Sequence, residues 1–230
     1  YLQAVTTKTQ QSCWKCRVVW AKRCPAFRLT VCPNRSAWRN EGGRAEMSVG
    51  ILALQGCIDP HHKKFAKLGV NSKDIRSADQ LNSIDRLVLP GGESTTMLKL
   101  LYDTGLDQGI KDFGQTKPVW GVCAGSILLA EEVHNPSQAS LGLMAIAAHR
   151  NHYGPQTFSF STSVNVTGIE TAIEAAFIRA PLLIAQSPEV EVLARHEGQE
   201  ILLKQDRLLA SAFHAELGHD STLHKLFLEL

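Results

Sequence analysis

The sequence predicts an α/β fold in which helices flank a mostly parallel sheet. Three times, a short apolar segment leads into a glycine turn and then into a helical pattern: SVGILALQG before HHKKFAKLG, RLVLPGG before STTMLKLLYDTG, and KPVWGVC before AGSILLAEEV. Short buried strands that alternate with helices are typical of a parallel sheet with both faces covered. Functional residues gather at the carboxyl ends of such strands, where the three glycine turns fall (Gln55-Gly56, Gly91-Gly92, and Gly121 to Gly125).

The remaining elements follow from local patterns. Gly69 closes the first predicted helix, because glycine tolerates a left-handed backbone. From Leu141 the pattern becomes richer in strands, as in TFSFSTSVNV, and the alternation in EVEVLA and ILLKQ around EGQ predicts a hairpin. STLHKLFLEL predicts a terminal helix. Residues 47–230 therefore form one predicted domain without an internal linker.

Residues 1–46 differ in character from the rest of the chain. Their first 40 positions hold eight lysines and arginines but no acidic residue, and they show no sustained period of two or of 3.6. We interpret residues 1–46 as a basic N-terminal extension: a poorly ordered arm, a targeting segment, or an artefact of gene-start choice ahead of Met47. A zinc site is a further alternative, with the ligands Cys13, Cys16, Cys24 and Cys32. Their C-x2-C-x7-C-x7-C spacing lacks the second close pair of common structural zinc motifs.

Composition and charge narrow the class of protein. With 230 residues, 44% hydrophobic and 20% charged, the chain is typical of a soluble globular protein that buries a sizeable core. A formal net charge of +2 gives no electrostatic case for binding nucleic acid or an anionic membrane. The sequence contains no run of about 18 apolar residues, so we expect no membrane-spanning helix. Only Cys57 and Cys123 lie outside the extension, so we expect a cytoplasmic protein rather than a disulfide scaffold, with organellar targeting by residues 1–46 as the alternative.

The segment GVCAGS places Cys123 between two glycines, directly after an apolar strand and before a helix. A G-x-C-x-G pattern allows the abrupt turn that exposes a nucleophile, because a Cβ at either glycine would meet neighbouring backbone. A helix beginning at Ala124 would point its positive end at the sulfur. The alternative from the motif alone is a buried core thiol.

A thiol nucleophile needs a base, and His214 is the best candidate among nine histidines. It closes the apolar strand LLASAF, and Glu216 follows two positions later, on the same side of an extended segment. A carboxylate there can fix the imidazole tautomer. The other histidines are expected to be mostly surface or capping residues. H-x-E alone is also compatible with solvated polar residues at a strand end.

The segment LPGGEST offers a third component, stabilisation of an oxyanion. Gly91 and Gly92 can present backbone N–H groups at a strand end, and the N–H of Ala124 can join them. The alternative for this segment is a simple turn followed by a helix cap at Ser94.

Six segments carry a resemblance to a known family. ALQG, LPGGESTT, GVCAG, HRNHYG, FIRAP and AFHAEL occur in this order and spacing, from about Met47 to the C-terminus. They resemble the glutaminase subunits of pyridoxal 5′-phosphate synthases, which are class I (triad) glutamine amidotransferases. The resemblance implies a flavodoxin-like three-layer fold and hydrolysis of L-glutamine to L-glutamate and ammonia. The ammonia would pass to a separate synthase subunit, so the expected partners are that subunit and glutamine, with no metal or cofactor.

The resemblance also implies roles for individual residues. Cys123 matches the nucleophile, His214 the base and acid, and Glu216 the residue that orients the base. The substrate-contacting positions correspond to Gly92, Glu93, Ser94, Arg150, Ile178 and Arg179. An arginine suits a substrate carboxylate, although Arg150 or Arg179 alone could equally form a surface salt bridge. Gln55 matches a residue near the synthase interface that helps to switch on the oxyanion hole.

The chain departs from the family pattern at several positions. Pro155 stands where an arginine is usual, Ala215 replaces a proline beside the base, Asp59-Pro60 replaces an Arg-Glu pair, and Ser126 replaces an aliphatic residue. None of these departures removes a triad residue. Two alternatives to the main hypothesis are a glutaminase that serves another synthase and a weakly active paralogue that binds a partner.

Overall fold

The computed structural model describes residues 47–154, 157 and 159–230. The predictions for residues 1–46, including the zinc alternative at Cys13, Cys16, Cys24 and Cys32, lie outside the described residues, as does Pro155.

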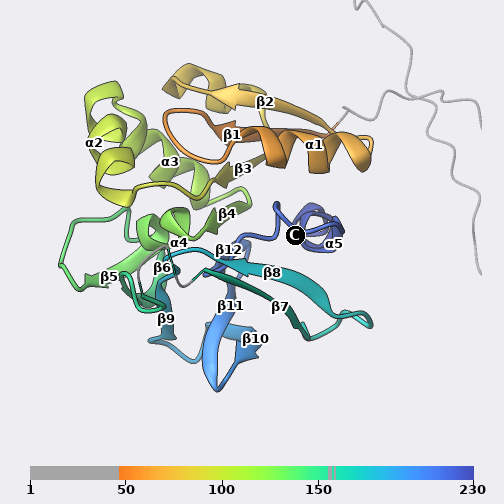
Figure 1. Ribbon diagram of the computed structural model, residues 1–230. Coiled ribbons are helices and arrows are strands. Elements are labelled where there is room, and N and C mark those ends of the chain that lie inside the picture. The colour runs from red at the N-terminus through yellow and green to blue at the C-terminus, as the bar shows by residue number, and fades with distance from the viewer. Residues whose placement is uncertain (1–46, 155–156, 158) are drawn as a thin grey trace, which may run out of the picture. The chain divides into compact units, whose positions relative to one another are not determined.

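A ten-stranded sheet forms the centre of the described chain (Figure 1), in the order β2-β1-β3-β4-β12-β11-β9-β6-β5, with β10 paired to β11. Its strands are β1 Ser48–Leu52, β2 Asn71–Ile75, β3 Arg86–Leu89, β4 Val119–Val122, β5 Ala130–His134, β6 Met144–His149, β9 Leu182–Ala185, β10 Glu191–His196, β11 Gln199–Gln205 and β12 Leu208–Ser211. Strands β2, β1, β3, β4 and β12 run parallel, as do β5 and β6. Strands β9, β10 and β11 pair antiparallel with their neighbours. The predicted mostly parallel sheet and the EVEVLA–ILLKQ hairpin are confirmed.

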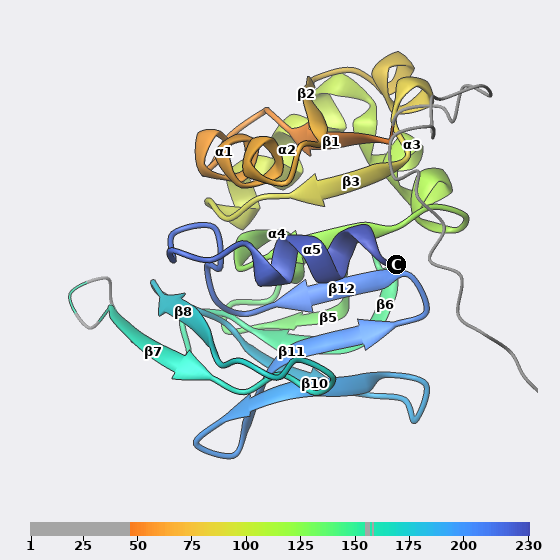
Figure 2. The ribbon, with the colours of Figure 1, turned by 90° about the vertical axis from the view of Figure 1, so that its right-hand side faces the viewer.

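Helices cover both faces of this sheet, which gives three layers. The helices are α1 Asp59–Lys67, α2 Ser94–Thr104, α3 Leu106–Gly114, α4 Ala124–Leu129 and α5 Thr222–Leu228, with a 3-10 turn at Ala78–Ser83. Helices α1 and α5 lie on one face, and α2, α3 and α4 lie on the other (Figures 1 and 2). Gly69 takes a φ of 72° just after α1, as its predicted capping role requires. Among the residues that the structure describes, no helix combines the length and apolar character of a bilayer crossing.

The burial of the strands explains their order. Every residue of β1, β4 and β12 is buried, as expected for strands covered on both faces. Strand β2 was not predicted, because its sequence NSKDI is polar. It lies at the edge of the sheet, where charged residues such as Lys73 and Asp74 protect an exposed strand.

One other segment differs from the prediction, and one agrees with it. The helix after Cys123 ends at Leu129, and the next residues form β5 instead of further helix. The segment TFSFSTSVNV supplies β7, Phe160–Val164, which pairs with β8, Ile173–Phe177, in a separate two-stranded sheet. This small sheet lies on the same side of the main sheet as α5 (Figures 1 and 2).

Two departures from the family pattern fit the fold. Asp59 and Pro60 are the first two residues of α1. An acidic residue interacts favourably with the helix N-terminus, and a proline there sacrifices no helical hydrogen bond. The fully buried Ser126 hydroxyl lies 2.9 Å from the carbonyl oxygen of Gly121 and 2.7 Å from that of Ser211, so β4 and β12 satisfy it.

Candidate active site

Cys123 occupies a strained turn between β4 and α4. Its φ of 50° and ψ of −101° are unusual for a residue with a side chain. A Cβ added to Gly121 would lie 2.6 Å from the carbonyl carbon of Gly125, and one added to Gly125 would lie 2.0 Å from the carbonyl oxygen of Leu89. Both glycines are therefore required by close backbone approach, as the G-x-C-x-G pattern predicts.

His214 and Glu216 form a buried pair. His214 Nδ1 donates a hydrogen bond to Glu216 Oε1 at 2.6 Å, so Nε2 is left to face the pocket. The side chain of Glu216 is fully buried and that of His214 is 9% exposed. The prediction that both lie on one extended segment is wrong: β12 ends at Ser211, and Glu216 lies in a turn. That turn brings the two side chains together.

Opposing effects set the pKa of each member of this pair. Burial lowers the pKa of His214, but interactions with Cys123 and Glu216 outweigh it and raise that pKa to about 10. Burial raises the pKa of Glu216, whereas the hydrogen bond from His214 and the charge of that imidazolium lower it, and the net direction is down. The pair is therefore an imidazolium and a carboxylate at neutral pH.

The short segment 176–179 contacts both His214 and Cys123. His214 N donates to the carbonyl oxygen of Ala176 at 2.8 Å, and Ala176 N donates back to His214 at 3.4 Å. Cys123 Sγ lies 3.9 Å from the carbonyl oxygen of Ile178. Arg179 follows with a φ of 47° and is exposed at the pocket.

The glycine loop after β3 packs against the base and against the loop after β1. A Cβ added to Gly91 would lie 2.2 Å from His214 Cε1, so only glycine fits beside the imidazole. Cys57 N donates to the carbonyl oxygen of Gly91 at 2.8 Å, and Glu93 N donates to Gln55 Oε1 at 2.9 Å. Gln55, expected to act at the partner interface, therefore also fixes the backbone of the glycine loop.

Glu93 and Arg150 form an ion pair at the pocket, with Nη2 and Oε1 3.2 Å apart. Burial raises the pKa of Glu93, but hydrogen bonds from Thr95 and Thr96 have the larger combined effect and lower this pKa to about 2. Glu93 also caps α2 by accepting from Thr96 N, so the capping role suggested for Ser94 belongs to its neighbour. The Ser94 hydroxyl donates instead to Gln138 Oε1 at 3.0 Å.

These residues surround one cavity of about 610 Å³, a size typical of small-molecule sites. Its lining includes eleven of the twelve predicted site residues: Gln55, Gly91, Gly92, Glu93, Ser94, Cys123, Ala124, Arg150, Ile178, Arg179 and His214. Glu216, the twelfth, lies behind His214 and does not line the cavity. Among the described residues, no group of three or more histidines, cysteines or acidic residues is placed to hold a metal ion.

Sequence reasoning missed several residues around this site. Cys57, Asn151 and Leu217 also line the cavity. Burial, followed by the charge of Glu216, raises the pKa of Cys57 to about 11, so this thiol stays protonated and does not compete as a thiolate. The only sequence signal for Cys57 was its position directly after ALQG.

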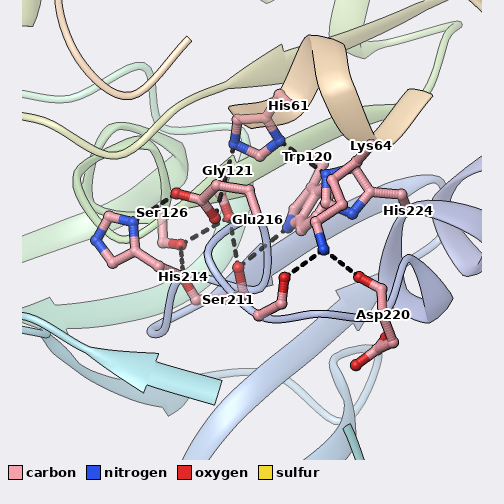
Figure 3. Close-up of polar contacts among 11 residues, drawn as sticks. His61, Lys64, Trp120, Gly121, Ser126, Ser211, His214, Glu216, Asp220 and His224 are labelled. Atoms are coloured by element: carbon pink, nitrogen blue, oxygen red, sulfur yellow. Dashed lines mark hydrogen bonds and ion pairs between the residues drawn. The ribbon is translucent and has the colours of Figure 1, made fainter. Parts of the chain in front are cut away.

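Two histidines are exceptions to the expectation that most of the other histidines lie at the surface. His61 on α1 and His224 on α5 are fully buried behind Glu216. His61 Nδ1 and His224 Nε2 are 3.0 Å apart, and His61 Nε2 lies 3.8 Å from Glu216 Oε2. Figure 3 shows this row of side chains leading away from His214.

Comparisons with known proteins show the family of this chain. The sequence profile of the SNO glutamine amidotransferase family matches residues 51–230. Pyridoxal 5′-phosphate synthase subunit PdxT of Koribacter versatilis is 42% identical over 186 residues, which cover 80% of this chain and 95% of that protein. The PdxT proteins of Thermotoga neapolitana (40% identical; 80% and 99% covered) and Solibacter usitatus (44%; 78% and 97%) are similarly close.

Solved structures show the same similarity. A crystal structure of glutamine amidotransferase superimposes with a TM-score of 0.74 at 38% identity and covers 79% of this chain and 97% of its own. The structure of PurLQS from Thermotoga maritima has a TM-score of 0.59 at 14% identity and covers 80% and 98%, so it shares the fold.

Proposed function

Because this chain belongs to the SNO glutamine amidotransferase family, we propose that it hydrolyses L-glutamine to L-glutamate and ammonia as the glutaminase subunit of a pyridoxal 5′-phosphate synthase. One observation carries the proposal: the strained Cys123 lines one cavity together with His214, which is hydrogen-bonded to Glu216 behind it. A nucleophile, a base and a residue that orients the base are the components of triad catalysis.

The reaction takes place in two halves. The Cys123 thiolate attacks the side-chain amide carbon of glutamine, and the imidazolium of His214 gives its proton to the departing ammonia. This step leaves a thioester between Cys123 and the glutamyl group. Neutral His214 then takes a proton from water, whose hydroxide attacks the thioester and releases glutamate. A His214 pKa of about 10 suits the first half, since the proton is already in place at neutral pH.

Backbone N–H groups stabilise the negative charge that develops on the amide oxygen. The candidates are Gly91, Gly92 and Ala124, all of which line the cavity next to Cys123. Ala124 is the first residue of α4, where backbone N–H groups lack helical partners.

The ion pair of Glu93 and Arg150 suits an amino acid substrate. Glutamine carries an α-ammonium and an α-carboxylate. It can therefore insert between the two side chains, with its carboxylate against Arg150 and its ammonium against Glu93. The planar guanidinium of Arg150 fits the carboxylate, and Glu93 stays ionised because its pKa is about 2. Ser94, Ile178 and Arg179 complete the substrate-binding wall of the cavity.

The proposed partner is the synthase subunit that consumes the ammonia, with Gln55 at or near the contact. Gln55 supports this role because its side chain holds the backbone of the glycine loop, so a change at Gln55 reaches the oxyanion site. We place the reaction in the cytoplasm, where a reducing environment keeps a nucleophilic thiol free; Cys57 and Cys123 are both unpaired.

Glutamate release from glutamine, measured with and without a pyridoxal 5′-phosphate synthase partner subunit, tests the proposal. We expect turnover that the partner increases, and loss of at least ~10³-fold in Cys123→Ala, as for removal of a nucleophile. Cys57→Ala, the matched control in the same cavity, should retain turnover. Absence of glutamate release while the partner still binds would contradict the glutaminase reading and favour a binding role. Activation by a different synthase alone would contradict the assigned pathway.

A further inference from the structure

A buried row of polar side chains continues beyond the triad (Figure 3). Glu216 uses Oε1 to accept from His214, while Oε2 is buried without a hydrogen-bond partner. His61 Nε2 lies 3.8 Å from Oε2. His61 Nδ1 in turn shares a hydrogen bond with His224 Nε2 at 3.0 Å.

The surroundings of the two histidines keep them neutral. The Trp120 and Phe65 rings meet the His224 ring edge to face, with centroids 4.9 and 5.1 Å apart, and Trp120 meets His61 in the same way at 5.5 Å. Burial is the main cause that lowers the pKa of His61 to about 4 and that of His224 to about 2. Each ring therefore carries a single N–H at neutral pH.

Two arrangements of these protons satisfy the bond between the rings. If His61 donates from Nδ1, its Nε2 lone pair faces the Glu216 carboxylate, and His224 Nδ1–H is a buried donor without a partner. If His224 donates from Nε2, His61 Nε2–H faces the carboxylate, and His224 Nδ1 is an unpartnered acceptor. In the second arrangement the Glu216 carboxylate faces an N–H of His61, which attracts it, in place of a lone pair, which repels it. The second arrangement also leaves an acceptor unpaired on His224, and a buried unpaired acceptor is tolerated better than a buried unpaired N–H.

We propose that His61 is a positioning residue that holds the free oxygen of Glu216 through Nε2–H, and that His224 selects the required tautomer of His61. Both oxygens of Glu216 then interact with a histidine N–H, Oε1 with His214 and Oε2 with His61. The attraction acts across 3.8 Å of apolar surroundings, where a charge and a dipole interact more strongly than in water. The row links α1 and α5 to the imidazole that faces Cys123.

Three other polar groups near the row leave this assignment in place. Cys57 interacts with Glu216 through charge and hydrogen bonding, but its raised pKa keeps it a neutral thiol, which is a weak donor. Lys64 donates to the carbonyl oxygens of Gly218 and Asp220 and so is engaged with the chain after Glu216. His62, next to His61 on α1, points to Ser72 and Asp74 instead.

Nitrogen-15 NMR of the histidine rings in the full chain tests the tautomers without reference to activity. Two-bond proton–nitrogen correlations distinguish Nδ1–H from Nε2–H, and His61→Gln and His224→Gln spectra assign the two rings. We expect both rings as the Nε2–H form at pH 7. An Nδ1–H form at His61 overturns the proposal, whatever the enzyme's activity.

Kinetics test the positioning role and rest on the proposed glutaminase function. His61→Leu should lower kcat about tenfold with KM within about twofold, because one interaction with a charged group is lost away from the substrate. His61→Gln places an amide N–H near the former Nε2 and should recover kcat to within about threefold of the wild type. His62→Leu, the matched control, should leave kcat unchanged. An unchanged kcat in His61→Leu, or an equal loss in His61→Gln, overturns the role. If the wild type shows no turnover, the proposed function fails, while the tautomer result still decides the inference.

Discussion

The charge of His214 depends on two neighbours that act in the same direction. Glu216 accepts the Nδ1–H of His214 at 2.6 Å and its negative charge favours the imidazolium, and interaction with Cys123 favours it as well. Together they overcome burial, which alone would favour the neutral ring. The imidazole is thus protonated at rest, and in the proposed reaction it becomes a base only after it has lost its proton to the leaving group.

Replacing Glu216 by Gln should reduce the pKa of His214 below about 10, since a neutral amide no longer stabilises the imidazolium. A titration of the His214 ring by NMR measures this change directly. We expect kcat to fall as well, because the amide also supplies an N–H where the wild type accepts one. An unchanged His214 pKa would show that Cys123 alone sets the charge.

The two pKa shifts also predict how the stability difference between wild type and Glu216→Gln varies with pH. The raised pKa of His214 stabilises the wild type fully below the unfolded value of 6.5, and this contribution declines as pH rises towards about 10. The lowered pKa of Glu216 stabilises it above the unfolded value of 4.5 and is lost in acid. The stability advantage of wild type over Glu216→Gln should therefore peak between these two values. Denaturant unfolding across the pH range measures the difference.

At the scale of elements, the sequence predicts what is encoded locally. The glycine turns, the strands before them and the α1, α2 and α5 helices follow from short patterns, and the parallel arrangement then brings Gly91, Cys123 and His214 to one end of the sheet. His61 and His224 could not be found in this way. They are 163 residues apart, and their contact exists only because α1 and α5 pack beside each other on one face. Glu216 was found by spacing, but the turn that orients it was not.

Helix α1 also holds the turn that carries Glu216. Lys64 Nζ is buried and donates to the carbonyl oxygen of Gly218 at 2.5 Å and to that of Asp220. Lys64→Met keeps the aliphatic stem but leaves both carbonyls unpaired, so it should cost about 2 kcal/mol of unfolding free energy. Urea unfolding measures the loss, and Lys63→Met, on an exposed neighbour, should stay within about 0.5 kcal/mol of the wild type. Equal stability of the two variants would deny α1 this role.

At the scale of the whole molecule, the family match and the predicted domain cover the same part of the chain. The match spans residues 51–230, and the predicted domain spans 47–230, so residues 1–46 stay a predicted extension. A chain consisting of 47–230 should therefore unfold at the same temperature as the full chain and turn over glutamine at the same rate. Thermal unfolding and glutamate release measured side by side decide this. A lower melting temperature for the shorter chain would mean that residues 1–46 contribute to the folded domain.

The pairing of Ala176 with His214 has a consequence for how the enzyme tolerates change. Residues 176–179 contact His214, approach the sulfur of Cys123 and line the cavity, all within four positions at a strand end. One added or deleted residue here would displace three catalytic components at once. The β7–β8 connection at 165–172, mostly exposed and remote from these contacts, carries no such constraint. Insertions and deletions should thus be tolerated at 165–172 but not at 176–179, so a loop can be engineered at 165–172 without loss of turnover.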